Sequence, residues 1–197
     1  DIRQLSLIIA YIVDQKSPFT AQHSARVGVL AKYIAEQYGV EEFSAQKIEI
    51  AGYLHDIGKL QMPDNILEKP GSLNATERSI INQHSYETYE ILRRIKGLED
   101  IALWAGYHHE TINGTGYPFH PSNKEFAIEA RILAVADIFQ ALVQDRPYRK
   151  GMQIEQVTTI IKEYSEQKRL DSSVVEVALT HLDKCFEIAS GNARENS

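Results

Sequence analysis

The pair His55-Asp56 sets an imidazole beside a carboxylate at the end of an apolar segment. Side chains of the same two kinds recur further along the chain, at His84, His108, His109 and Asp137. Imidazole nitrogens mixed with carboxylate oxygens suit Mn, Fe, Zn or Ni. These groups are more than one ion needs, so we predict two divalent metal ions that share a bridging carboxylate. Such centres are typical of enzymes that hydrolyse phosphoesters.

Helix geometry gives the two residues of the pair different roles. Adjacent residues on a helix point about 100° apart, so His55 and Asp56 are not expected to chelate one ion from a single face. We expect His55 to bind one ion and Asp56, through its two oxygens, to bridge to the other. Two metals about 3.5–4 Å apart lower the pKa of a bridging water, and the resulting hydroxide attacks phosphorus in line.

Basic residues near these ligands are suited to phosphate. Lys59 follows Asp56 by one helical turn, and we predict that its ammonium serves the leaving oxygen during catalysis. Arg146 and Arg149 follow the segment that contains Asp137, and their planar guanidinium groups suit a second phosphate. An isolated basic run is more often a solvated face, so this second prediction depends on the proximity of Asp137.

The composition is that of an ordinary globular domain. The chain has 197 residues, of which 43% are hydrophobic and 24% charged, and this length predicts one domain. Its net charge of -6 argues against binding a nucleic acid polymer. The single cysteine excludes an internal disulfide and fits the cytoplasm. No apolar run of transmembrane length or signal peptide is present, and the first residue, Asp1, suggests an excised domain.

Hydrophobic periodicity is helical nearly throughout, which predicts an all-α bundle of about eight helices with the metal site in its core. The segment 127–143 is apolar on most sides and is expected to be central. Asn74 and Glu77 resemble a capping box that opens a helix. Residues 57–73 and 110–125 are rich in Gly and Pro and are predicted to be mostly loop. Two more helices are expected near 153–165 and 172–189.

The organisation of the domain follows from this pattern. Residues 1–16 are predicted to be an N-terminal helix from an upstream module, 17–190 the main domain, and 191–197 a disordered tail. Ile2, Leu5, Ile9 and Ile12 form a short apolar stripe on the first helix. Two interpretations remain open, because barely two turns cannot decide between them. The helix either packs on its own domain or belongs to a signalling helix through which two copies dimerise.

An ordered set of motifs resembles the HD-GYP branch of the HD-domain phosphohydrolases, from about Thr20 to Lys150. The matching stretches are His23 to Val27, His55 to Lys59, Ile66 to Gly71, His108 to Glu110, Gly114 to Pro118, Ala130 to Asp137 and Arg146 to Arg149. The resemblance implies a cytoplasmic bacterial signalling enzyme that hydrolyses cyclic di-GMP to pGpG and often onward to GMP.

The resemblance also implies roles for individual residues. The implied metal ligands are His23, His55, Asp56, His84, His108, His109 and Asp137. Lys59 and Asp56 are the implied catalytic residues. The implied substrate contacts are Gly116, Tyr117, Arg146 and Arg149. The loop that contains Gly116 and Tyr117 is, in this family, a suspected docking surface for diguanylate cyclase domains.

Three positions depart from the family pattern. Phe19 stands where some members have a Glu that holds a third metal, so we predict two metals. Asn113 replaces the usual Asp before the Gly-x-Gly-Tyr-Pro motif, and residues 119–124 replace a glycine-containing stretch. The last two bear on the choice of substrate, and cyclic GMP-AMP is an alternative to cyclic di-GMP.

Two other functions compete with a cyclic-dinucleotide phosphodiesterase. One is a receptor or docking domain that holds metals and ligand but turns over slowly. The other is a phosphohydrolase of nucleotides or (p)ppGpp, against which the Gly-Thr-Gly-Tyr-Pro loop and the second histidine of His108-His109 argue. We interpret His181 as structural, and His120 as a weaker candidate for contact with the ligand.

Overall fold

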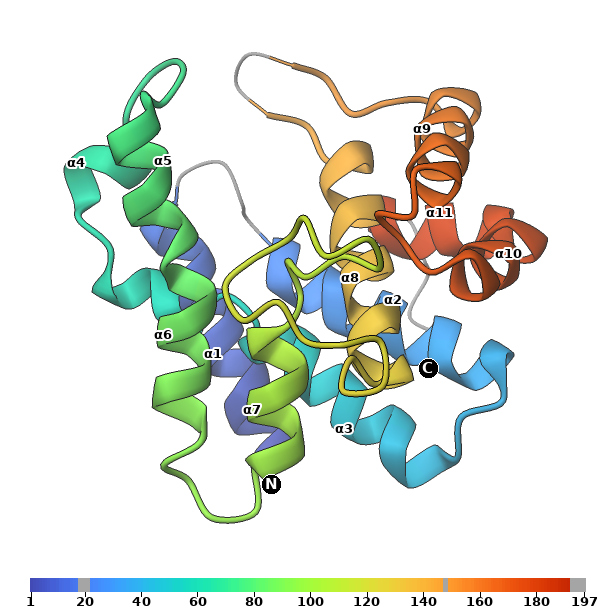
Figure 1. Cartoon of the computed structure of the whole chain (residues 1–197), viewed down its shortest axis with the longest axis horizontal. Helices are drawn as coiled ribbons and strands as arrows, with labels where there is room; N and C mark the ends of the chain where they lie inside the picture. The colour runs from blue at the N-terminus through green and yellow to red at the C-terminus, as the bar shows by residue number, and fades with distance from the viewer. Residues whose placement is uncertain (18–21, 147–148, 192–197) are drawn as a thin grey trace.

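The computed structural model describes residues 1–17, 22–146 and 149–191, and over these ranges the chain is helical (Figure 1). The first half contains α1 (Ile2–Lys16), α2 (His23–Tyr38), α3 (Glu42–Leu54), the 3-10 helix η1 (Ile57–Gln61), α4 (Asp64–Leu67) and α5 (Ala75–Asn82). The second half contains α6 (His84–Leu92), α7 (Glu99–Gly106), α8 (Ile128–Val143), α9 (Ile154–Glu166), α10 (Ser172–Thr180) and α11 (Leu182–Ser190). The prediction of an all-α fold is confirmed.

The described ranges hold eleven α-helices where we expected about eight, because several expected segments are interrupted. The predicted loop 57–73 contains η1 and the short helix α4. The helix that Asn74 opens is broken at Gln83, and the expected helix 172–189 is broken at His181. The predicted capping box is present: the backbone N–H of Glu77 donates to Asn74 Oδ1 over 2.8 Å, and the Glu77 carboxylate accepts from the backbone of Asn74 over 2.9 Å.

A close crossing of α2 and α3 lies at the centre of the domain. A Cβ atom on Gly52 of α3 would lie only 2.4 Å from the Cα atom of Gly28 on α2, so the two backbones meet without side chains between them. The apolar face of α2, including Leu30 and Ile34, is fully buried beside this crossing. The crossing fixes the end of α3, which the pair His55-Asp56 directly follows.

Helix α8 is central, as its apolar sequence predicts. It packs against α2, α3 and α7, and its residues Ile132, Val135 and Phe139 are completely buried. Asp137 is only 7% exposed on the same helix. Since a buried carboxylate without partners is costly, the fold must supply polar groups or a cation opposite Asp137.

Helix α1 packs on the domain through one face. It contacts α2, α3 and η1, and the guanidinium of Arg3 donates to both carboxylate oxygens of Glu49 on α3 over 2.7 and 2.8 Å. Leu5, Ile8 and Ile12 lie on the other face and are between 53% and 57% exposed. The predicted homodimer through this helix stays a prediction.

Within the described ranges, none of the helices has the length and apolar character that crossing a membrane requires. Phe19, on which the prediction of two rather than three metals depended, lies outside the described residues, as do residues 192–197 of the predicted tail. The predicted domain limits stay predictions.

Candidate metal centre and substrate cavities

Six segments bring the predicted ligands together. His23 and His84 are the first residues of α2 and α6, and Asp137 lies in the middle of α8. His55 and Asp56 directly follow α3, and the pair His108-His109 follows α7 by one residue. Four of the five histidines are nearly inaccessible, and His109 is partly exposed. A helix end allows adjacent residues to diverge, which is how each pair contributes two side chains to one centre.

The carboxylate of Asp56 lies between two groups of histidines. Its Oδ1 atom is 3.3 Å from Nε2 of His84 and 3.8 Å from Nε2 of His108. Its Oδ2 atom is 3.4 Å from Nε2 of His55 and 3.9 Å from Nε2 of His23. The two oxygens therefore face opposite sides of the centre, as a bridging ligand requires.

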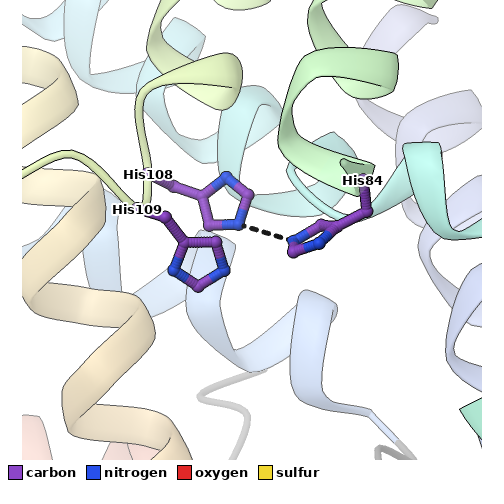
Figure 2. Close-up of side chains that lie close together, drawn as sticks. All are labelled: His84, His108 and His109. Carbon is purple, nitrogen blue, oxygen red and sulfur yellow. Dashed lines mark hydrogen bonds between the residues drawn. The ribbon is translucent and has the colours of Figure 1, made fainter. Parts of the chain in front are cut away.

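Two sets of three donors flank this carboxylate. On one side, Nε2 of His23 and Nε2 of His55 lie 3.1 and 3.5 Å from Oδ1 of Asp137. On the other side are His84, His108 and His109, with Nε2 of His84 and Nε2 of His108 separated by 3.3 Å (Figure 2). In each set the donor atoms lie within 4.8 Å of one another, which is compact enough for one ion.

Hydrogen bonds on the outer ring nitrogens orient the histidines. Nδ1 of His55 and of His84 lies 2.6 Å from the backbone carbonyl three residues earlier, at Gly52 and Ile81. Nδ1 of His108 lies 2.5 Å from the carbonyl of Ala105 in the same way. Because a carbonyl only accepts, each Nδ1 carries the proton, and Nε2 is left with its lone pair facing the centre.

The ring of His23 is oriented by a side chain that the sequence did not single out. Its Nδ1 atom lies 2.5 Å from Oε1 of Gln140, and Nε2 of Gln140 donates to the carbonyl of Ala189 over 3.2 Å. Gln140 is completely buried and lies one turn after Asp137 on α8. That spacing was the available signal, because residues three apart share a helix face.

The electrostatics favour the protonation states that bind metal. Burial opposes the charge on Asp56 and Asp137, but the surrounding histidines outweigh it and hold the pKa of both carboxyls well below the usual range. Burial lowers the pKa of His109 to about 3 and that of His108 well below its usual value, and neighbouring imidazoles act in the same direction. These carboxyls are therefore ionised and these two imidazoles neutral at pH 7.

His55 shows where positive charge is favoured. Burial opposes a charge on its ring, yet Asp56 and Asp137 raise its pKa to about 9. Its Nε2 atom is buried and has no hydrogen-bond partner among the described residues. A buried nitrogen without a partner is costly, and a metal ion would satisfy both this atom and the adjacent carboxylates. The residues present therefore fit divalent cations.

Two cavities adjoin the centre on either side of α8 residues Ile138 and Ala141. A cavity of about 330 Å³ is lined by His23, Asp56, Lys59 and Lys69 and by apolar residues that include Ile66 and Leu73. A cavity of about 530 Å³ is lined by His108, His109, Tyr117, Tyr164 and Arg169 among others. Both cavities reach His109 and Arg146, so a ligand with two arms could occupy both while its middle contacts the centre.

The predicted substrate residues fall into different environments. Arg146 lines both cavities, and its Nε atom is buried without a hydrogen-bond partner among the described residues. Arg149 lines the larger cavity, but its guanidinium donates to the carbonyls of Ala141 and Leu142 over 3.1 and 3.4 Å, at the end of α8. Arg146 is therefore the freer of the two to meet a ligand.

The glycine loop packs directly on His109. The ring of Tyr117 stacks on the His109 ring with centroids 4.9 Å apart. A Cβ atom on Gly116 would lie 2.3 Å from the carbonyl oxygen of His109, so only glycine allows this approach. Glu110 was not singled out from the sequence, yet its Oε1 atom accepts from the backbone N–H groups of Phe119 and His120 over 2.6 and 3.2 Å and fixes the end of the loop.

The two remaining histidines lie outside this arrangement. His120 is exposed, its Nδ1 atom is 3.2 Å from the carbonyl of Gly114, and it does not line either cavity among the described residues. The ring of His181 meets the ring of Tyr33 edge-on at 6.1 Å, which is a packing contact. Lys59 lies in the smaller cavity with its ammonium 2.6 Å from Oδ2 of Asp56.

Comparisons with known proteins agree with this geometry. The family model described as HD domain matches residues 8–174. The 3'3'-cGAMP-specific phosphodiesterase 1 of Vibrio cholerae is 36% identical over 189 residues, which cover 96% of this chain and 44% of that protein. A cyclic di-GMP phosphodiesterase of Thermotoga maritima is 38% identical over 174 residues, covering 87% of this chain and 47% of that protein. The chain thus spans less than half of either relative.

A solved structure shows the same fold. The HD domain of the Listeria monocytogenes phosphodiesterase PgpH, in complex with cyclic-di-AMP, superposes with a TM-score of 0.66 at 19% sequence identity. The match covers 96% of this chain and 99% of that chain. At this level of identity the likeness concerns the arrangement of the helices.

Proposed function

Because this chain belongs to the HD domain family, in the HD-GYP branch that its motifs resemble, we propose that it is a metal-dependent phosphodiesterase of cyclic dinucleotides. The observation that carries the proposal is the placement of Asp56 between two compact sets of donors. Two divalent ions held there would share the Asp56 carboxylate. His23, His55 and Asp137 would hold one ion, and His84, His108 and His109 the other.

Metal ions in such a centre supply an activated water and neutralise phosphate charge. The protein itself supplies orientation, since the outer nitrogens of His23, His55, His84 and His108 are fixed by hydrogen bonds. Lys59 is in place to give its proton, or its charge, to the departing ribose oxygen. Arg146 lies between the cavities and is in place to hold the phosphate that is not cleaved.

We propose cyclic di-GMP and 3'3'-cGAMP as the substrates, with the linear dinucleotide as the first product and pGpG in the case of cyclic di-GMP. Relatives that act on each of these two molecules are at least 36% identical to this chain. Two purine arms joined through a central ring of phosphates and riboses match two cavities that meet at His109 and Arg146. The two substrates share one guanine, so the choice between them depends on the second base.

The test is turnover by the protein purified without oxygen and supplied with Mn or Fe(II). Each cyclic dinucleotide is incubated separately, products are resolved by chromatography, and bound metal is counted in the same sample. Asp56→Ala is the control for metal-dependent hydrolysis. Conversion to linear products by the wild type alone supports the proposal. A wild-type protein with two ions bound that leaves both substrates intact would instead be a receptor.

A further inference from the structure

The far wall of the 530 Å³ cavity carries a cation that has no assigned role. The guanidinium carbon of Arg169 lies 3.9 Å from the centre of the Tyr164 ring, and both residues line this cavity. Among the described residues, the Tyr164 ring is the only contact recorded for the Arg169 guanidinium. Its N–H groups are therefore available to a ligand. Arg169 does not line the smaller cavity, so it faces one arm of a two-armed ligand only.

The backbone around Arg169 is held in place by the loop that precedes the Gly-Tyr-Pro motif. The backbone N–H of Asn113 donates to the carbonyl of Lys168 over 2.8 Å, and its side-chain amide donates to the carbonyl of Gln167 over 3.0 Å. Lys168 itself has a φ of +55°, the left-handed conformation that turns the chain back, and the N–H of Arg169 donates to the carbonyl of Tyr164.

This arrangement explains Asn113. An aspartate at this position has no amide to donate, and its carboxylate would lie against the carbonyl of Gln167. Oδ1 of Asn113 meanwhile accepts from Thr111 and Thr115, so one side chain ties the loop to itself and to the end of α9. Asn113 is thus a positioning residue for the turn that carries Arg169.

The chemistry of the wall suits a guanine base. Tyr117, Tyr164, Leu142 and Leu170 give the cavity aromatic and apolar surface for a purine. A guanidinium donates two parallel hydrogen bonds, and guanine presents two adjacent acceptors, O6 and N7. Adenine presents N7 beside an amino group, which is a donor and is mismatched with Arg169. The phosphates, by contrast, are expected near the centre and Arg146.

We infer that the 530 Å³ cavity is a guanine pocket and that Arg169 selects guanine over adenine in one arm of the substrate. The inference rests on the proposed function and names its specificity residue. It predicts that a cyclic dinucleotide without any guanine is discriminated against, whereas the base of the other arm is free to vary.

The experiment compares 3'3'-cGAMP with cyclic di-AMP, which differ in a single base. The ratio of their kcat/KM values, or of KM to the inhibition constant where cyclic di-AMP is not cleaved, is measured for wild type and variants. Arg169→Ala should reduce the preference for guanine about 10- to 100-fold. Arg169→Gln should shift it further toward adenine, because glutamine pairs with N6 and N7 of adenine. Asn113→Asp should weaken the preference in the same direction.

Two controls separate selectivity from damage. Lys162→Ala removes an exposed cation from the same helix as Tyr164, outside the cavity, and should leave the ratio unchanged. Bis(4-nitrophenyl) phosphate carries no base, so Arg169→Ala should cleave it at the wild-type rate.

The outcomes are distinguishable. A wild type that cleaves the nitrophenyl diester but neither binds nor cleaves any cyclic dinucleotide overturns the proposed function and the inference with it. An active wild type whose preference survives Arg169→Ala overturns the guanine pocket alone. An equal loss on 3'3'-cGAMP and cyclic di-AMP also overturns it, because that result assigns Arg169 to a phosphate.

Discussion

The ammonium of Lys59 lies 2.6 Å from Oδ2 of Asp56, the oxygen of that carboxylate that faces His55 rather than His84. The contact is buried on the Asp56 side and open to the smaller cavity on the Lys59 side. Lys59 is thus held beside the expected bridging ligand while its N–H groups remain within reach of a substrate oxygen.

Lys59→Ala is expected to retain its metal ions and to lose rate. If Lys59 serves as an acid for the leaving oxygen, kcat for a cyclic dinucleotide should fall about 10²- to 10⁴-fold. The loss should be much smaller for bis(4-nitrophenyl) phosphate, because nitrophenolate leaves without a proton. Metal content and both rates are measured on the same preparation. A metal loss equal to that of Asp56→Ala would show that Lys59 is structural.

Asp56→Ala should lose metal and activity together. Both oxygens of Asp56 face donor sets, so its removal weakens both candidate ion sites and not one of them. We expect fewer than one ion per chain by elemental analysis, and no turnover above background. His84→Ala is the comparison, since it touches one set only and should spare the His23, His55 and Asp137 set. Retention of two ions by Asp56→Ala would remove it from the bridging position.

Gln140→Leu should weaken the metal centre although Gln140 is not a ligand. The change keeps the volume but removes the acceptor for Nδ1 of His23. Loss of such an outer partner typically lowers metal affinity about 10- to 100-fold. Competition with a fluorescent chelator measures the affinity, and Gln140→Glu, which keeps an acceptor, should recover most of it. Wild-type affinity in Gln140→Leu would mean that His23 is oriented by other contacts.

Arg146→Ala should act on substrate binding more than on chemistry. Its guanidinium borders both cavities and its Nε atom is buried without a partner in the described part of the chain. Loss of a charge-assisted hydrogen bond costs about 1.5–3 kcal/mol. KM should therefore rise roughly 10- to 150-fold, with kcat less affected. Unchanged kinetics would exclude Arg146 from the site.

Glu49 should make stability depend on pH. Burial alone would raise the pKa of Glu49, but hydrogen bonds from Arg3 and Tyr53 outweigh it and lower the pKa below its ordinary value of 4.5. The folded state therefore prefers the ionised form. Its contribution is present above pH 4.5 and is lost as the pH falls through the lower folded-state pKa. Glu49→Gln should unfold about 1 kcal/mol more easily at pH 7, and denaturant titrations should show the gap closing in acid.

The sequence predicted the ligands because buried histidines and carboxylates stand out against apolar helices. Asp137 is the clearest example, since nothing apolar explains a carboxylate in the middle of α8. The break of the expected C-terminal helix at His181 was not predictable, because the apolar pattern continues through it. The contact of Asn113 with Gln167 joins residues 54 apart through a turn at Lys168, and no periodicity encodes such a turn.

The hydrogen bond from Gln140 to the carbonyl of Ala189 has a practical consequence for anyone trimming this domain. Ala189 belongs to α11, so a shortened chain that ends before this helix removes the anchor of the amide that orients His23. Such a fragment could be well folded by circular dichroism and still be purified with little metal. Deletion series on this protein should therefore be ranked by ions per chain before any fragment is declared inactive.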